Sequence, residues 1–202
     1  MNINIDSYCY IRENVFEKIQ RTKTVDKIVM AILMAFLTGI LAQIVLPLPW
    51  IPVPITGQTL GALASGLFLG KRYGALSQIM YILGGVVGIA WYGEMTSGLD
   101  ILLGSTFGYF IGLVLAAALI GHFAEKYSES RKFKKMFVLM SIANFGCVYI
   151  PGLIGLTVWM YSTQGAFPDI ITLFMMGLAP FIIGDIFKIG IAAGISKVGL
   201  PK

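Results

Sequence analysis

The sequence predicts an all-α integral membrane protein, a bundle of six transmembrane helices with both termini in the cytoplasm. Three observations lead to this prediction. Hydrophobic residues make up 57% of the 202 residues, and charged residues only 12%. The mean hydropathy is +0.82, well above the level typical of soluble domains. The chain also has 24 glycines, which suits helices that pack closely in lipid through small residues.

The first 27 residues are expected to form a cytoplasmic segment that lies in the membrane interface. Ile11, Val15 and Ile19 recur at helical spacing between charged residues. A docking motif for another protein is the alternative. The stretch does not resemble a cleavable signal peptide, because its charged portion is long and no small-residue cleavage site follows a short apolar core. We expect the whole chain, residues 1–202, to form one membrane domain.

Six apolar segments follow, and each is expected to form a helix that crosses the membrane. Such a helix needs roughly 20 residues. The second segment is short, and the fifth contains Pro151. The six segments are Ile28–Val45, about Ile55–Leu69, Tyr73–Ala90, Ile101–Phe123, Met136–Tyr161 and Ile170–Ile195.

Positive charges occur in every second connection between these segments. Lys and Arg residues precede the first segment, lie between segments two and three and between four and five, and follow the sixth. By contrast, residues 46–54, 91–100 and 162–169 contain neither Lys nor Arg. Because positively charged connections are retained on the cytoplasmic side of a membrane, these three connections are predicted to face outside.

Asp185 and Lys188 are the only charged residues in the sixth segment. A charged side chain at membrane depth costs at least about 2.5 kcal/mol on insertion scales, so charges inside such a segment indicate function. A spacing of three places both side chains on one helical face. There they can bind each other or a polar ligand, and a purely structural ion pair is the alternative.

Residue patterns for catalysis or cofactor binding are absent. Cys9, Cys147 and the single His122 lack metal-ligand spacing. The stretch Gly66–Arg72 is one residue too short for a phosphate-binding loop, and Arg72 replaces the Ser or Thr that would hold magnesium. We therefore expect no enzyme activity, no metal, no resident cofactor and no nucleic-acid partner. Any uphill transport must draw on a partner's ATPase or on an ion gradient.

Polar and aromatic side chains near the outer connections are candidates for ligand contacts. Prolines stiffen residues 49–61, where Thr56 and Gln58 offer neutral hydrogen-bonding groups. An aromatic pair lies at the outer end of the third segment, and two polar residues lie in the fifth. These four residues are Trp91, Tyr92, Asn144 and Tyr149. An interfacial aromatic belt and hydrogen bonds between helices are the respective alternatives.

Four strings in the sequence are similar to those of a known family. They are PVPITGQTLGALASGLFLGKRYGALS at 52–77, YILGGVVG at 81–88, GSTFGYFIG at 104–112 and GLAPFIIGDIFKIGIAA at 177–193. On these strings the chain resembles the BioY family, the biotin-binding S components of energy-coupling factor (ECF) transporters. Two stretches depart from the family's pattern, since GSTFGY stands in place of GPTGGY and IAWYGE in place of PVFAGG.

The resemblance implies a multi-pass protein of a prokaryotic cell membrane that binds biotin in a pocket facing outside. It also implies partners, namely a transmembrane coupling (T) subunit and cytoplasmic ATPases that make the S component reorient. The family's coupling surface includes small residues spaced by four on the first helix, and Ala31 and Ala35 match this pattern. Packing of these alanines inside the bundle is the alternative. The alternative functions are a solitary biotin carrier and an S component for a different vitamin.

If biotin is the ligand, Asp185 and Lys188 suit its urea group. The carboxylate would accept a hydrogen bond from a urea N–H, and the ammonium would donate one to the urea carbonyl. The alternative is that Lys188 pairs with the carboxylate of biotin, because the outer connections contain no Lys or Arg. In either case Trp91 and Tyr92 are expected to cover the apolar thioether ring.

Overall fold

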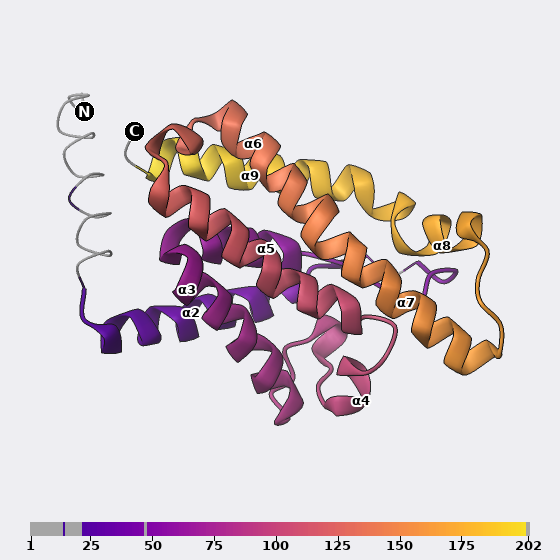
Figure 1. Cartoon of the computed structure of the whole chain (residues 1–202). Coiled ribbons are helices and arrows are strands. Elements are labelled where there is room, and N and C mark those ends of the chain that lie inside the picture. The colour runs from indigo at the N-terminus through magenta and orange to yellow at the C-terminus, as the bar shows by residue number, and fades with distance from the viewer. Residues whose placement is uncertain (1–13, 15–21, 47, 201–202) are drawn as a thin grey trace.

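The computed structural model describes residue 14, residues 22–46 and residues 48–200, and these are mainly helical (Figure 1). Most of the expected interfacial segment, with Cys9, lies outside the described residues. The elements in chain order are α2 (Thr24–Ala42), β1 (Val45–Leu46), β2 (Ile55–Thr56), α3 (Gln58–Val86), α4 (Leu99–Leu102), α5 (Phe107–Lys126), α6 (Phe133–Ile142), α7 (Tyr149–Gln164), α8 (Ile170–Gly177) and α9 (Ile182–Gly199).

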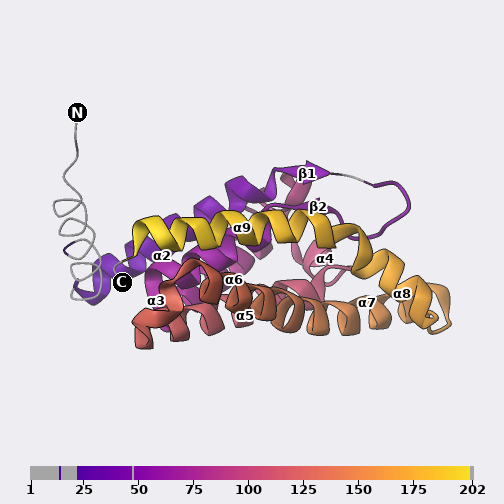
Figure 2. The ribbon, with the colours of Figure 1, turned by 90° about the horizontal axis from the view of Figure 1, so that it is seen from above.

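Helix α3 lies at the centre of the bundle, where it packs against α2, α5 and α9. Helix α5 packs in turn against α7, and α6 packs against α9. Seen from above, α2 and α9 lie on one side and α6 and α7 on the other (Figure 2). The largest group of buried apolar side chains joins α3, α5, α6 and α9. It includes Leu67, Ile120, Met140 and Ile189.

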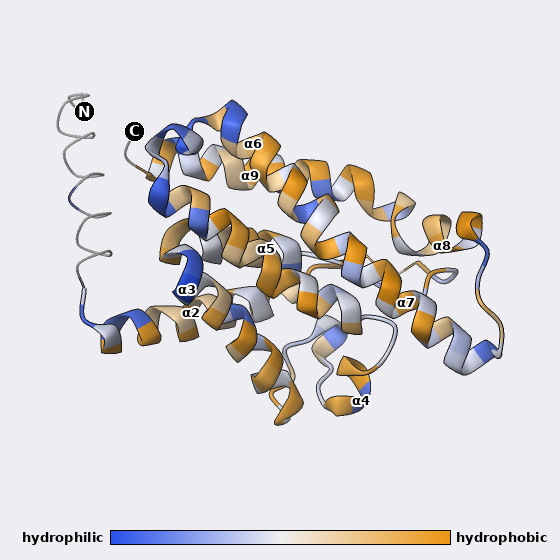
Figure 3. Ribbon diagram, in the orientation of Figure 1, coloured by the Kyte–Doolittle hydropathy of each residue, from blue (hydrophilic) through white to orange (hydrophobic). Residues whose placement is uncertain are grey.

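The described residues contain four helical stretches that are long and apolar enough to cross a membrane. They are Thr24–Ala42, Phe107–Lys126, Phe133–Gln164 and Ile170–Gly199. Large apolar side chains point outward from them, since Leu33, Ile154 and Phe187 are 62%, 61% and 71% exposed. Figure 3 shows this apolar character along the bundle, and hydrophilic residues near the end where α5 ends and α6 begins. Such a surface is suited to lipid rather than to water.

The second and third predicted segments form one element, α3, which changes direction at Gly70. Gly70 has φ +75°, a value that L side chains rarely adopt. The backbone N–H of Lys71 donates to Glu125 Oε2 on α5 at 3.1 Å, so α5 caps the helical stretch that follows the kink. The expected helix start at Ile55 is wrong. Residues Ile55–Thr56 instead form β2, which pairs antiparallel with β1, because the preceding prolines favour an extended backbone.

The sixth predicted segment is two helices rather than one, which corrects the prediction. Helix α8 ends at Gly177, a short 3-10 turn spans Ala179–Phe181, and α9 begins at Ile182. Pro180 lies in that turn; it has no backbone N–H, and its ring clashes with a preceding helical turn. The break places Asp185 in the first turn of α9. The fourth segment also divides, into the short α4 and the long α5.

The fifth segment continues through Pro151 by means of a π turn. Residues Ala143–Val148 form a π-helix between α6 and α7. Pro151 cannot donate a hydrogen bond to the carbonyl four residues earlier, and the wider turn lies directly before it. The π turn carries Asn144 and leads into Tyr149 at the start of α7, and both side chains reach Asp185 on α9.

Glycines on α5 let this helix approach α7 closely. A Cβ at Gly108 would meet the backbone of Pro151, and a Cβ at Gly112 would meet the backbone of Val148. On α9, by contrast, nothing lies within 4 Å of a Cβ built at Gly190 or Gly194. The glycines of α5 therefore allow close packing against α7, whereas these two glycines of α9 face open space.

Ala31 and Ala35 lie inside the bundle, at 0% and 1% exposed. Ala35 packs in a cluster with Tyr81 and Trp91. Contact of these alanines with a coupling subunit stays a prediction, and in this conformation the bundle covers both side chains. Their burial fits the alternative, in which small side chains allow α2 to pack tightly on its neighbours.

Candidate functional site

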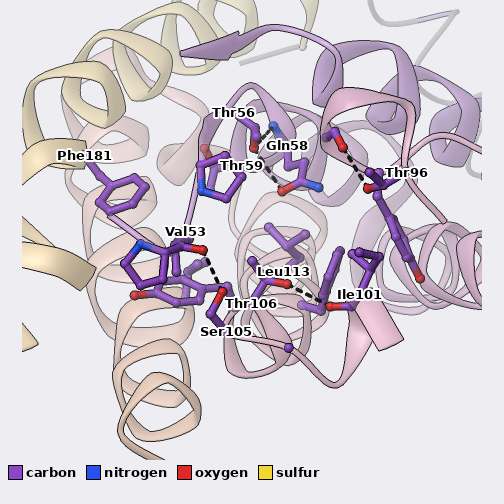
Figure 4. A pocket seen from close by; sticks show the side chains of 18 of the residues that line it. Val53, Thr56, Gln58, Thr59, Thr96, Ile101, Ser105, Thr106, Leu113 and Phe181 are labelled. Carbon is purple, nitrogen blue, oxygen red and sulfur yellow. Dashed lines mark hydrogen bonds between the residues drawn. The ribbon is translucent and has the colours of Figure 1, made fainter. Parts of the chain in front are cut away.

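A cavity of about 330 Å³ lies between the β1–β2 hairpin, residues 92–106 and helices α5, α7 and α9. This volume is in the range of about 300–1,000 Å³ typical of small-molecule sites. Figure 4 shows side chains from these elements converging on it, with Val53 and Phe181 on one side and Ile101 and Leu113 on another. The lining is therefore mostly apolar, and its polar groups come from a few positions.

The carboxylate of Asp185 is the most enclosed charged group of the cavity, at 1% exposed. Its Oδ2 accepts hydrogen bonds from Asn144 Nδ2, at 2.6 Å, and from the hydroxyl of Tyr149. Its Oδ1 lies 2.5 Å from Lys188 Nζ. A buried charge costs several kcal/mol unless it is paired and hydrogen-bonded, and this network supplies both kinds of partner.

Lys188 connects α9 to the hairpin. Its ammonium donates to the backbone carbonyl of Thr56 at 2.8 Å, in addition to the ion pair with Asp185. Its side chain is 12% exposed. An ammonium has three N–H groups. Two of them face these partners, and the third is available to a ligand in the cavity.

The helix break before α9 contributes to the electrostatics of the pair. Because Asp185 lies in the first turn of α9, its carboxylate is close to the positive end of the helix dipole, an interaction that contributes about 0.3–1 kcal/mol in typical cases. A single uninterrupted helix over residues 170–195 would place the pair in mid-helix, without this stabilisation. Pro180 was the signal in the sequence that could have revealed the break.

The hairpin supplies neutral polar groups, as the sequence predicts. The hydroxyl of Thr56 donates to Gln58 Oε1 at 2.9 Å, and Gln58 Nε2 donates to the hydroxyl of Tyr81 at 2.6 Å. Both residues line the cavity. Thr59 Oγ1 also lines it, is enclosed, and has no hydrogen-bond partner within the described chain. That hydroxyl therefore has unused hydrogen-bonding capacity, although it is covered in this conformation.

The hairpin is also fastened to the opposite wall of the cavity. Ser105 Oγ donates to the carbonyl of Pro52 at 2.7 Å (Figure 4). Ser105 is one of the positions where the chain departs from the BioY pattern, which has proline there. A proline could not make this hydrogen bond, because it has no side-chain donor.

Trp91 and Tyr92 are both buried but occupy different positions. Tyr92 lines the cavity, and its hydroxyl donates to the carbonyl of Ile82 at 2.5 Å. Burial raises the pKa of Tyr92 to about 12, so its phenol is neutral. Trp91 is not among the lining residues; its Nε1 donates to the carbonyl of Tyr81 at 2.8 Å, and its ring packs edge-on against Phe36. Direct contact of Trp91 with a ligand stays a prediction, and its position outside the lining does not support it.

The other predicted residues are found close to Asp185. Tyr149 lines the cavity, whereas Asn144 is not among the lining residues and acts through the carboxylate. Sequence reasoning missed Tyr109, Trp159 and Phe181, three aromatic residues of the lining. In the sequence of an apolar helical segment, nothing distinguishes an aromatic residue that faces a cavity from one that faces lipid. Phe181 does, however, belong to the string at 177–193 that carries the resemblance.

The arrangement suits recognition of an uncharged polar group rather than catalysis. Asp185 and Lys188 present an acceptor and a donor side by side in the cavity, where Asp185 is the most enclosed of the charged residues. Among the described residues no group of three or more His, Cys, Asp or Glu is arranged to hold a metal ion. A ligand with adjacent N–H and C=O groups and an apolar body matches this lining.

Comparison with known proteins gives concordant results. A family model described as the BioY family matches residues 15–200. A probable biotin transporter BioY of Methanothermobacter thermautotrophicus is 48% identical over 138 residues, which cover 68% of this chain and 88% of that protein. The biotin transporter BioY of Thermotoga maritima is 31% identical over 163 residues, which cover 78% of this chain and 90% of that protein.

One solved structure has a similar fold. It is a crystal structure described as the S-component for biotin from an ECF-type ABC transporter, and it matches with a TM-score of 0.74. The match covers 86% of this chain and 89% of that one, at 24% sequence identity. At this identity the likeness concerns the fold.

Proposed function

Since the chain belongs to the BioY family, we propose that it is the biotin-binding membrane subunit of an ECF-type transporter, with Asp185 and Lys188 as the main polar contacts of biotin. The observation that carries this proposal is the ion pair at the enclosed part of a cavity of about 330 Å³. The relatives are named as transporters, in agreement with the expectation that the chain is not an enzyme.

The urea of biotin is the group that the pair binds in this proposal. Among the described residues, Asp185 Oδ1 has the Lys188 ammonium beside it and no further hydrogen-bond donor, so it has acceptor capacity left for a urea N–H. The third N–H of Lys188 donates to the urea carbonyl. Thr59 adds a hydroxyl in the same cavity, and Tyr109, Trp159 and Phe181 provide apolar surface for the thioether ring.

The chain crosses the membrane six times in this proposal, with both termini in the cytoplasm. The two arms of α3 on either side of Gly70 and the four long apolar stretches together provide six crossings. Hydrophilic residues gather near the end of the bundle where α5 ends and α6 begins (Figure 3). That end includes Lys132 and Lys135, paired with Glu129, so the positive-inside rule assigns it to the cytoplasm of a prokaryotic cell.

Uptake requires partners under this proposal, namely a transmembrane T subunit and cytoplasmic ATPases, because the sequence contains no phosphate-binding loop of the required length. The buried Ala31 and Ala35 are poor candidates for the T-subunit contact in this conformation. A solitary biotin carrier and an S component for a different vitamin stay the alternatives. Ligand-depleted protein that binds another vitamin more tightly than biotin would favour the latter.

The test is a binding titration with biotin and with biotin amide, which keeps the urea and removes the charge of the tail. Removing one member of a buried ion pair costs roughly 3–5 kcal/mol, because the other member is left unpaired. If part of this cost falls on the bound state, Lys188→Ala and Asp185→Ala each weaken biotin binding by roughly a hundredfold or more. A contact with the urea weakens biotin and biotin amide by similar factors.

Lys126→Ala serves as the control, since it removes a positive charge from the far end of α5. It is expected to leave binding unchanged. Gel filtration and thermal unfolding of every variant separate lost binding from lost folding. Folded Lys188→Ala and Asp185→Ala variants that bind biotin as tightly as the parent protein would show that the pair is structural and that the ligand lies elsewhere.

A further inference from the structure

The cavity has two further charged residues at its outer end, and both are negative. Glu94 and Asp100 line the cavity and are exposed, whereas Asp185 is 1% exposed. Lys188 is the only basic residue of the lining, and its ammonium already faces Asp185 and the carbonyl of Thr56. A ligand that extends from the enclosed pair to the opening therefore meets two carboxylates and no free cation.

Glu94 is held at the opening by a turn with many hydrogen bonds. Both Glu94 and Met95 have positive φ, at 60° and 55°, a conformation that is uncommon for residues other than glycine. Gln43 on α2 fixes this turn, since its Nε2 donates to the carbonyls of Trp91 and Tyr92 and its Oε1 accepts from the N–H of Met95. The turn belongs to a stretch that departs from the BioY pattern, with IAWYGE in place of PVFAGG.

We propose that Glu94 and Asp100 set the tail specificity of the site, so that it favours biotin derivatives with an uncharged tail over biotin itself. This rests on the proposed function and adds the class of substrate, namely biotin whose carboxyl group is in amide linkage. With the urea on Asp185 and Lys188, the tail of biotin points to the opening, where its carboxylate is repelled by both acidic residues. An amide tail avoids this repulsion because it carries no charge.

The expected effect is modest, because both carboxylates are exposed to solvent. Two unit charges about 10 Å from the tail in water change affinity by roughly three- to fivefold in total. Higher ionic strength should reduce this effect on affinity, since the screening length falls from about 30 Å at 0.01 M salt to about 3 Å at 1 M. Repulsion between like charges also slows association, so the effect should appear in the on-rate.

The test compares biotin and biotin amide on the parent protein and on a Glu94→Gln/Asp100→Asn double variant, at about 0.01 M and about 1 M salt. In the parent protein, biotin amide is expected to bind at least as tightly as biotin. In the double variant, the affinity of biotin relative to biotin amide should rise at least threefold at low salt and less at high salt. Asp169→Asn is the control, because it neutralises a carboxylate that is not in the cavity lining, and the ratio should not change.

Two results would overturn the proposal while leaving the proposed function intact. One is a parent protein that binds biotin at least tenfold more tightly than the amide, which would place the tail carboxylate on Lys188. The other is an unchanged ratio in the double variant. The single variants Glu94→Gln and Asp100→Asn provide the same measurement if the double variant folds poorly. Failure of the parent protein to bind either compound would contradict the proposed function, and this proposal with it.

Discussion

The single residue on which the site depends most is Asp185. Its carboxylate is buried among four favourable partners, which are Asn144, Tyr149, Lys188 and the N-terminal end of α9. A carboxylate with this many partners keeps one orientation, so it is already arranged for a ligand before binding. Such preorganisation reduces the cost of binding, because few side chains must be ordered.

Tyr149→Phe removes one of these partners without changing the shape of the side chain. A hydrogen bond to a charged group contributes about 1.5–3 kcal/mol to stability. Some of this loss affects the ligand-free protein as well as the complex, so we expect the affinity for biotin to fall by roughly tenfold. Titration calorimetry in detergent measures the change. Tyr161→Phe is the control, because Tyr161 is exposed and outside the cavity lining. Equal affinities of parent protein and Tyr149→Phe would mean that Asn144 alone orients the carboxylate.

Trp159 is expected to report ligand binding by its fluorescence. It lines the cavity, whereas Trp91 packs behind Tyr81 and Trp50 is 66% exposed. Biotin should therefore change the emission of Trp159, and Trp159→Phe should remove most of the signal while Trp91→Phe retains it. A response that disappears with Trp91→Phe and persists with Trp159→Phe would argue against the position of the ligand proposed above.

Among the elements, α3 has the clearest structural requirement, at the kink that joins its two arms. Gly70 has φ +75°, and a Cβ there would meet the side chain of Glu125. The carboxylate of Glu125 caps the second arm through the N–H of Lys71. Helices α3 and α5 are also in close contact at Gly121, where a Cβ would meet the backbone of Gly70 and Lys71. The kink thus fixes both arms of α3 against one helix.

Gly70→Ala is expected to destabilise the protein by roughly 1–3 kcal/mol, from the strained backbone and the contact with Glu125. Gly190→Ala is the matched control, since a Cβ at Gly190 has open space and a helical position tolerates alanine. Thermal unfolding in a mild detergent should show a lower midpoint for Gly70→Ala only. A similar midpoint for both variants would mean that the kink relaxes at little cost.

At the scale of the whole molecule, charge separates the two ends of the bundle. The hydrophilic residues near the end where α5 ends and α6 begins contrast with the apolar helices between the ends (Figure 3). The opposite end holds the hairpin, α4 and the cavity opening (Figure 2). The cavity opening thus lies away from the basic residues of the connection between α5 and α6, where a protein that takes up an external solute needs it.

Cysteine labelling in intact cells tests this orientation. Gln164→Cys and Lys134→Cys each introduce an exposed thiol, at opposite ends of the long α6–α7 stretch, in a protein whose Cys9 and Cys147 are replaced by serine. A membrane-impermeant maleimide should label Gln164→Cys in intact cells and Lys134→Cys only after lysis. The reverse pattern would place the termini outside and contradict the proposed topology.

The sequence by itself determined the class of protein and the central pair of the site. Hydropathy is a local property, so apolar segments and the two charges within one of them can be recognised without tertiary contacts. The breaks at Gly70 and Pro180 were visible as residue types, but the first was treated as a connection and the second was missed. Thr56, Gln58 and Tyr149, recognised in the sequence as polar residues near the outer connections, are brought together around the cavity by the structure.

Only the tertiary structure decided which side of each helix faces the cavity. Apolar helices in lipid lack the polar outer face that marks orientation in soluble proteins, so Trp91 and Trp159 look alike in the sequence, yet only Trp159 reaches the cavity. The same ambiguity explains why Ala31 and Ala35 are buried rather than open to a partner. The position of Glu94 at the opening depends on hydrogen bonds from Gln43, 51 residues earlier in the chain, and no local pattern encodes such a contact.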